Sequence, residues 1–472
     1  MTIRRSLALS LASLAIPFAA QAQRPAGSPN IHVLAHLPLG KTFTVAGIEV
    51  EQDLARPYAY VSRRIGGVRE PGFDIIQMKV PGGAKLIYSW RIDHGELHAG
   101  LGIVEGKYFK TRGRYYYVAC AQFEASGPDS DLGAVIFDVT GLPDPAAVRE
   151  VGRIKAPNSA RAPATDIASA QRRGSAAATP GGFHNVFPYK HSDGRIVMVA
   201  NTLTDTAAKL YDMDKFLAGD SSDGFIGVIP VPGATGRYHD YYVGYEPASR
   251  QDRFYGGVQP GGYFVFDITK PEAPRLLTSV TPGTTAATSP FGRGHTVTPS
   301  PDGRWLVTET EYQYAPLRIF DLKPGLDGTV ETITRPVGAW TARWKGLPHN
   351  HEVRWPYVFA SAYEDGLQVF NLMDPTAPYT VAYYDTYAGP LQAGIASAGQ
   401  RDNALIAGTG GVLNGAWGVD VRNADGIIVV SDEATGFWAF TMDGFDHWDG
   451  RNWGMPDISS AQDWDNGPVK KG

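Results

Sequence analysis

The sequence predicts an all-β protein, a seven-bladed β-propeller with four-stranded blades, and three observations lead to this prediction. The 472 residues include 55 Gly, 34 Pro and 11% aromatic residues with only 19% charged residues, which is typical of many short strands joined by turns. One strand-and-turn pattern recurs seven times. The last copy lacks an evident fourth strand, whereas a strand-like segment at residues 31–37 precedes the first copy. We therefore expect residues 31–37 to complete the seventh blade and close the ring.

The third strand of each copy is the most regular part of the repeat. It is a short aromatic or β-branched run, and in several copies a turn with Pro follows and ends the strand. These strands are expected at residues 73–77, 134–138, 208–212, 263–267, 317–321, 367–371 and 437–441.

This third strand, with its terminal Asp and the turn after it, resembles the repeat of the LVIVD-repeat family of exported bacterial proteins. The best matches are residues 133–138, 262–267 and 366–371, and the resemblance covers roughly residues 31–445. It implies a propeller. It implies no particular reaction, because a structural repeat defines the family.

The first 22 residues have the features of a secretory signal peptide. Arg4 and Arg5 precede an apolar stretch, and residues 20–22 form an A-x-A cleavage site. We expect general secretion, although the arginine pair also fits a twin-arginine signal. The protein is then periplasmic or secreted, without membrane insertion after cleavage. The expected organisation is a signal peptide at 1–22, a linker at 23–30, the propeller at 31–447 and a Trp/Asp-rich tail at 448–472.

Composition and motifs exclude several function classes. The net charge is −5 and no long basic run occurs, which argues against nucleic-acid binding. Cys120 is the only cysteine, so no intramolecular disulfide can form, and its strand-like context predicts a buried, inert thiol. The chain has no Gly-rich phosphate loop, no G-x-S-x-G and no H-E-x-x-H.

Histidine recurs at one phase of the repeat. Aligning the expected innermost strands brings seven residues to one position: Ile48, His98, His184, His239, His295, His351 and Trp417. Five of the seven are His in a chain with 11 His. Because the innermost strands surround the propeller axis, these imidazoles are expected to converge there and to bind a divalent transition metal. Iron or copper is preferred, and manganese or zinc is possible.

Carboxylates near the same phase are the candidate catalytic or orienting groups, since metal-ligating imidazoles need hydrogen-bond acceptors. They are Asp240, Glu352, Glu364 and Glu433, with Glu311 as a further acceptor. His349 is the off-phase histidine closest to the expected site.

These features predict an exported metalloenzyme, an oxidoreductase or oxygenase acting on a small organic substrate. A metal-dependent lyase acting on a polysaccharide or oligosaccharide and a non-catalytic binding or scaffold propeller remain alternatives. In-phase histidines can also be structural parts of a repeat. Insertions at residues 156–181 and 388–416 are expected to project as loops on the ligand face. Trp340, Trp344 and Trp417 are candidates for stacking on a ligand.

Overall fold

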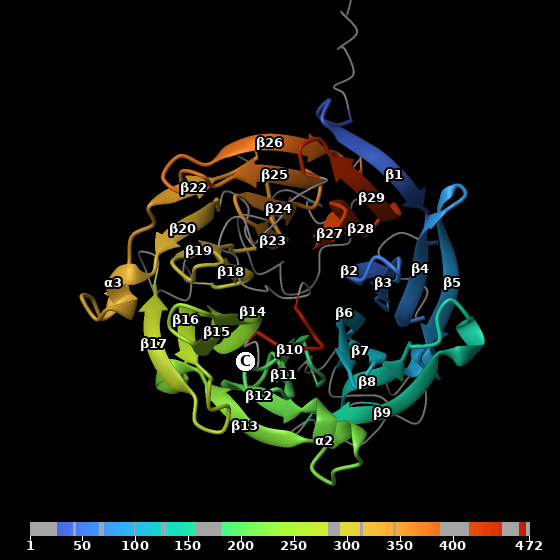
Figure 1. Cartoon of the computed structure of the whole chain (residues 1–472), viewed down its shortest axis with the longest axis horizontal. Coiled ribbons are helices and arrows are strands. Elements are labelled where there is room, and N and C mark those ends of the chain that lie inside the picture. Colours follow the sequence, from blue (N-terminus) through green and yellow to red (C-terminus); the bar gives the residue numbers. More distant parts are fainter. Residues whose placement is uncertain are drawn as a thin grey trace, which may run out of the picture.

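The computed structural model describes residues 26–40, 44–65, 70–98, 100–123, 129, 131–156, 181–281, 293–311, 315–342, 346–387, 415–445 and 462–468. Within these residues seven antiparallel sheets stand side by side around one axis, so the predicted seven-bladed β-propeller is confirmed (Figure 1). The expected signal peptide and most of both insertions lie outside the described residues.

The first four blades follow the chain from the innermost to the outermost strand. Blade 1 consists of β2 (Val45–Val50), β3 (Tyr58–Arg63), β4 (Gly72–Val80) and β5 (Gly83–Arg91). Blade 2 consists of β6 (Gly100–Thr111), β7 (Arg114–Phe123), β8 (Leu132–Asp138) and β9 (Arg149–Lys155). Blade 3 consists of β10 (Asn185–Lys190), β11 (Ile196–Asn201), β12 (Ala207–Asp212) and β13 (Phe225–Pro230). Blade 4 consists of β14 (Arg237–Glu246), β15 (Gln251–Gln259), β16 (Gly262–Asp267) and β17 (Arg275–Val280), with β21 (Thr332–Ile333) added at its edge.

The other three blades continue the ring. Blade 5 consists of β18 (Val297–Pro299), β19 (Trp305–Thr308), β20 (Leu317–Asp321) and β22 (Gly338–Trp340). Blade 6 consists of β23 (Asn350–Arg354), β24 (Tyr357–Ser361), β25 (Leu367–Asn371) and β26 (Tyr379–Tyr384). Blade 7 consists of β27 (Ala416–Arg422), β28 (Ile427–Asp432), β29 (Gly436–Met442) and β1 (Ile31–Leu37). Short helices lie in the connections: η1 (Gly95–Leu97), η2 (Pro145–Ala147), α2 (Met213–Leu217), η3 (Pro232–Ala234) and α3 (Lys323–Leu326).

The core lies between neighbouring blades. All seven predicted third strands are the third strands of their blades, and β8 is buried along its whole length. A strand covered on both faces carries apolar residues without polar alternation, which explains the regular pattern of the repeat. None of the helices within the described residues is long and apolar enough to cross a membrane.

The ring closes as predicted, because β1 pairs antiparallel with β29 as the outermost strand of blade 7. Ile31 is 7% exposed and packs in one apolar cluster with Phe440, Met442 and Phe445. The tail also contacts the ring: Trp464 is buried and lies edge-on to Tyr108 of blade 2, with ring centroids 6.0 Å apart.

Closure predicts unequal effects of two substitutions in the same strand. Ile31→Asp places a charge in the apolar cluster and should lower the free energy of unfolding by about 2–4 kcal/mol. Leu34 is 45% exposed, and Leu34→Asp should change the free energy of unfolding by less than about 0.5 kcal/mol. Urea denaturation of both variants checks this, and equal effects would contradict the role of the Ile31 cluster in closure.

Candidate metal centre

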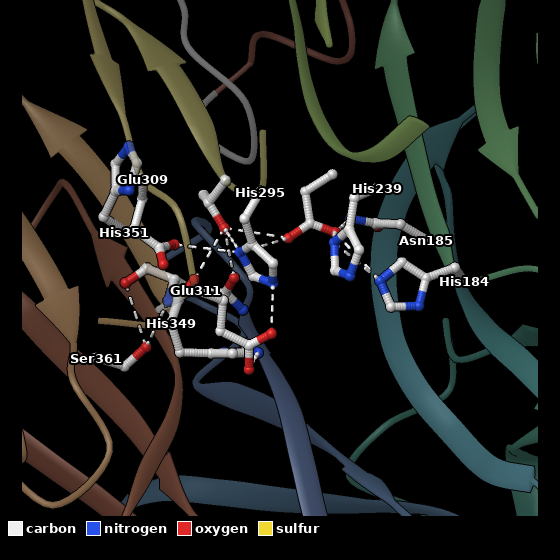
Figure 2. A network of polar contacts seen from close by, with 12 residues as sticks. His184, Asn185, His239, His295, Glu309, Glu311, His349, His351 and Ser361 are labelled. Carbon is white, nitrogen blue, oxygen red and sulfur yellow. Dashed lines mark hydrogen bonds and ion pairs between the residues drawn. The ribbon is translucent and has the colours of Figure 1, made fainter. Parts of the chain in front are cut away.

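Four histidines hold one equivalent position in four successive blades, at the start of the innermost strand: His184, His239, His295 and His349 (Figure 2). In three of these blades the backbone N–H of the histidine donates to a carbonyl oxygen at the end of the second strand, and the pairs are His184 with Asn201, His295 with Glu309 and His349 with Ser361. Closure of the ring therefore brings the four imidazoles together. Their ring centroids are 4.1, 4.2 and 5.1 Å apart from one blade to the next.

Blade 4 reaches the same arrangement through a β-bulge. The register of β14 and β15 shifts so that His239 and Asp240 together oppose Gly257. A bulge directs two successive side chains towards one region, which a regular strand does not do. Gly257 also allows the next blade to approach, because a Cβ atom there would lie 2.2 Å from the carbonyl oxygen of His295.

The alignment made from the sequence is correct for His184, His239, His295 and Trp417 but wrong in three blades. The equivalent residues there are Ala46, Val104 and His349, where the sequence indicated Ile48, His98 and His351. Bulges in β2 and β6 cause two of these errors, since each adds a residue that leaves no mark in the hydrophobic pattern.

His98 and His351 lie outside both groups of potential metal ligands. His98 is fully buried: Nε2 lies 2.9 Å from Asp129 Oδ2 and Nδ1 lies 2.8 Å from the carbonyl oxygen of His94. His351 pairs with Ala360 inside β23, and its ring lies at the edge of the network in Figure 2. Burial lowers the pKa of His351 to about 3.

The first group of potential ligands is His184, His239 and Asp240. His184 Nε2 lies 3.2 Å from His239 Nδ1 and 3.6 Å from Asp240 Oδ1, and these last two atoms are 3.3 Å apart. Ligands about 2.1 Å from one ion are separated by about 3.0–3.4 Å in octahedral or tetrahedral geometry. The three atoms therefore have nearly the spacing of ligands that share one metal ion.

Hydrogen bonding and burial keep these imidazoles in a state that could bind a metal ion. His184 Nδ1 donates to Gln122 Oε1 at 2.7 Å, which leaves the lone pair of Nε2 towards His239 and Asp240. Burial and the neighbouring His239 hold the pKa of His184 well below its ordinary value. Burial, followed by the charge on His295, lowers the pKa of His239 to about 4. Both rings are therefore neutral at pH 7, the state that binds metals.

Asp240 is the anion shared by three imidazoles. Burial alone would raise its pKa, but His295, His239 and His184 hold it well below the ordinary value. His295 has the opposite shift: burial would lower its pKa, but Glu309, Asp240 and Glu311 raise it to about 10. Its Nδ1 lies 3.2 Å from Glu309 Oε2 and 3.6 Å from Asp240 Oδ2. His295 is thus an imidazolium that neutralises buried carboxylates.

The second group is His295, Glu311 and His349. The carboxylate of Glu311 lies between the other two, 3.6 Å from His295 Nε2 and 3.9 Å from His349 Nε2. Tyr363 donates to Glu311 Oε1 at 2.6 Å, and His349 Nδ1 donates to the carbonyl oxygen of Trp417 at 2.6 Å. Burial and then His295 lower the pKa of His349 to about 3. This group is wider than the first, and one of its imidazoles is charged.

The other three predicted carboxylates lie outside both groups of potential ligands. Glu433 pairs with Arg64, whose guanidinium lies 4.8 Å from the ring centre of Trp417, and burial raises the pKa of Glu433 to about 7. Glu364 follows Tyr363 in a turn. Glu352 lies farther along the innermost strand β23, three residues after His349, where it accepts a hydrogen bond from Arg354 at 2.9 Å.

The three tryptophans that were predicted to stack on a ligand do not share one location. Trp340 stacks on Phe370 between blades 5 and 6, with centroids 4.3 Å apart, so it contributes to blade packing. Trp417 lies at the axial position and Trp344 lies outside the described residues.

A scan against protein-family models and a search of curated proteins gave no match.

Two groups that orient the histidines, Gln122 and Glu309, were not among the predicted site residues. Gln122 lies at the end of the second strand β7, and Glu309 directly follows the second strand β19, as Glu433 directly follows β28. A polar residue at the end of an otherwise apolar second strand is the sequence signal that would have found them.

The pKa of His295 is raised and the pKa values of the neighbouring histidines are lowered, and this difference can be tested by nitrogen NMR spectroscopy. At pH about 8.5 ordinary histidines are neutral, whereas His295, with its pKa raised to about 10, should remain doubly protonated in metal-free protein. Spectra of histidine-labelled protein should show one buried imidazolium, and His295→Gln should remove that signal. A spectrum with neutral imidazoles alone would contradict the charge assignment.

The buried contact between Lys107 and Glu49 on the innermost strands of blades 2 and 1 predicts a stability effect. Lys107 Nζ lies 2.7 Å from Glu49 Oε2, and burial raises the pKa of Glu49 well above its ordinary value even beside this lysine. Lys107→Met leaves a buried, unpaired carboxyl group and should lower the free energy of unfolding by about 3–5 kcal/mol. Adding Glu49→Gln should recover part of the loss in urea denaturation, because Lys107 also faces the buried Asp420. No recovery in the double variant would show that the effect of Lys107 does not depend on Glu49.

Proposed function

We propose that this protein is an iron-dependent oxidoreductase that uses dioxygen, with Fe(II) bound by His184, His239 and Asp240 at the propeller axis. One observation carries the proposal: two neutral imidazole nitrogens and one ionised carboxylate oxygen lie 3.2–3.6 Å from one another. Two histidines and one carboxylate with open positions form the ligand set of non-haem iron oxygenases.

The ligand set also favours one metal over others. A site of imidazoles alone suits copper or zinc as well as iron, but a carboxylate in the set moves the preference towards iron and manganese. Bound Fe(II) supplies the activation of dioxygen, and transfer of both oxygen atoms to an organic substrate needs no further reductant.

The residues around the three ligands have separate tasks. Gln122 fixes the ring of His184 through its hydrogen bond at 2.7 Å. His295 lies 3.6 Å from Asp240 Oδ2, and this contact supports the ionised state in which Oδ1 faces the two ligand imidazoles. Glu311, in the loop after β19, and His349, at the start of blade 6, lie on the other side of His295, so they are candidates to orient substrate or to move a proton. The expected signal peptide supports a reaction outside the cytoplasm.

Metal analysis tests the proposal. Protein reconstituted anaerobically with Fe(II) should bind about one equivalent, and His239→Ala or Asp240→Ala should reduce the affinity by at least about 100-fold. Gln122→Ala should reduce it by about 10–100-fold, because the ring of His184 is then free to turn.

His351→Asn is the matched control, since His351 is equally buried on the strand that follows His349 but lies outside both ligand groups. It should bind iron as the parent does. The proposal fails if the parent binds no Fe(II), or if the His239, Asp240 and His351 variants bind it equally. Oxygen consumption in a substrate screen, compared with the same screen under nitrogen, then separates an oxidoreductase from a metal-dependent lyase.

A further inference from the structure

The second group of potential ligands lies beside the proposed iron site and shares no residue with it. It consists of His295, Glu311 and His349 (Figure 2). Glu311 Oε2 lies 3.6 Å from His295 Nε2, and Glu311 Oε1 lies 3.9 Å from His349 Nε2. The carboxylate thus stands between two imidazole nitrogens that come from the starts of blades 5 and 6.

Both imidazoles of this group are oriented through their other nitrogen. His295 Nδ1 lies 3.2 Å from Glu309 Oε2, and His349 Nδ1 donates to the carbonyl oxygen of Trp417 at 2.6 Å. Metal-ligating histidines are usually held in this way, by a carboxylate or a backbone carbonyl at the nitrogen that does not bind the metal. The two Nε2 atoms are therefore the ones directed towards Glu311.

The nitrogen His295 Nε2 is the strongest sign of a missing ligand. The side chain of His295 is 1% exposed, and Nε2 is buried without a hydrogen-bond partner among the described residues. Its distance of 3.6 Å from Glu311 Oε2 is too long for a hydrogen bond. A buried polar atom without a partner is unfavourable. Tyr363 donates to Glu311 Oε1 at 2.6 Å, so Oε2 is the oxygen that faces this nitrogen.

The charges around His295 favour a further cation. Glu309 and Asp240 approach Nδ1 to 3.2 and 3.6 Å, and Glu311 approaches Nε2 to 3.6 Å. One imidazolium carries one positive charge for three carboxylates. The guanidinium of Arg64 also acts on Glu311, but it is already paired with a carboxylate of blade 7. Buried carboxylates are costly unless cations balance them.

From this geometry we infer that His295, Glu311 and His349 bind a second divalent transition-metal ion beside the proposed iron. Two imidazoles and one carboxylate leave open positions on such an ion, which can then hold and polarise an oxygen atom of the substrate. The ion takes the place of the proton on His295 Nε2. Because a proton has to leave and the spacing is wider than in the first group, the second ion should bind more weakly and only after the first.

The inference rests on the proposed function in so far as it places this ion next to iron. The ligand group itself can be tested in protein whose iron site is incomplete. His184→Ala removes one ligand of the first group and leaves all three residues of the second group in place.

The experiment is calorimetric titration of metal-free His184→Ala protein with Zn(II), which accepts this ligand set and is not oxidised in air. One equivalent should bind. Adding Glu311→Gln or His349→Asn should reduce the affinity by at least about 100-fold, because each removes a ligand. Adding Tyr363→Phe should reduce it by about 10-fold, because Glu311 then loses the hydrogen bond that orients it.

His351→Asn, added to His184→Ala, is the matched control, since His351 is buried on β23 but lies outside both ligand groups. It should leave Zn(II) binding unchanged, and circular dichroism should show the same folded state in every variant. The inference is overturned if His184→Ala protein binds no Zn(II), or if the Glu311 and His349 double variants bind it as well as His184→Ala protein does.

The two proposals can fail separately. Zn(II) bound through Glu311 and His349 in a protein whose parent binds no Fe(II) would refute the iron proposal and keep the second site. Fe(II) bound by the parent, with no Zn(II) bound by His184→Ala protein, would refute the second site and keep the iron proposal.

Discussion

The pairing of β1 with β29 is the constraint on which the rest of the structure depends. Seven blades joined in a closed ring must all direct their innermost strands at one axis, so a residue at one phase of the repeat meets its equivalents from the neighbouring blades. The fold by itself brings those positions together. Whether they bind a ligand is decided by the residues that fill them, and here four successive positions are histidine.

Charge balance then decides which of these histidines can bind a metal without losing a proton. Asp240 contacts three imidazoles, but only His295 is surrounded by enough carboxylates to be protonated near neutral pH. His184 and His239 remain neutral because they are buried among other imidazoles. The site is therefore unequal from one side to the other, with a compact pair of neutral nitrogens beside blades 3 and 4 and a cationic, carboxylate-rich side beside blades 5 and 6.

The sequence was sufficient for the fold and for half of the site. Third strands buried on both faces leave an unmistakable apolar run, and the unpaired segment before the first repeat correctly predicted closure. His184 and His295 were aligned correctly because they directly precede innermost strands without a register shift. His239 was also aligned correctly, because it is the first residue of the bulge in β14 and the extra residue follows it. Ile48 and His98 were misaligned because a bulge changes the phase of one strand without changing its hydrophobicity. His351 was chosen instead of His349 although β23 has a regular register, because two histidines stand two residues apart at the start of that strand. Gln122 and Glu309 were missed because contacts between second strands and the next blade depend on packing that no single repeat encodes.

The bulge at His239 and Asp240 has a consequence for how such a centre arises. A regular innermost strand offers the axis one side chain per two residues, so each blade contributes a single group. One extra residue opposite Gly257 lets blade 4 contribute an imidazole and a carboxylate together, while the hydrogen bonds on both sides of the bulge are kept. A repeat can thus gain a second potential ligand from one additional residue at a strand start, whereas a substitution at the axial position only exchanges one group for another.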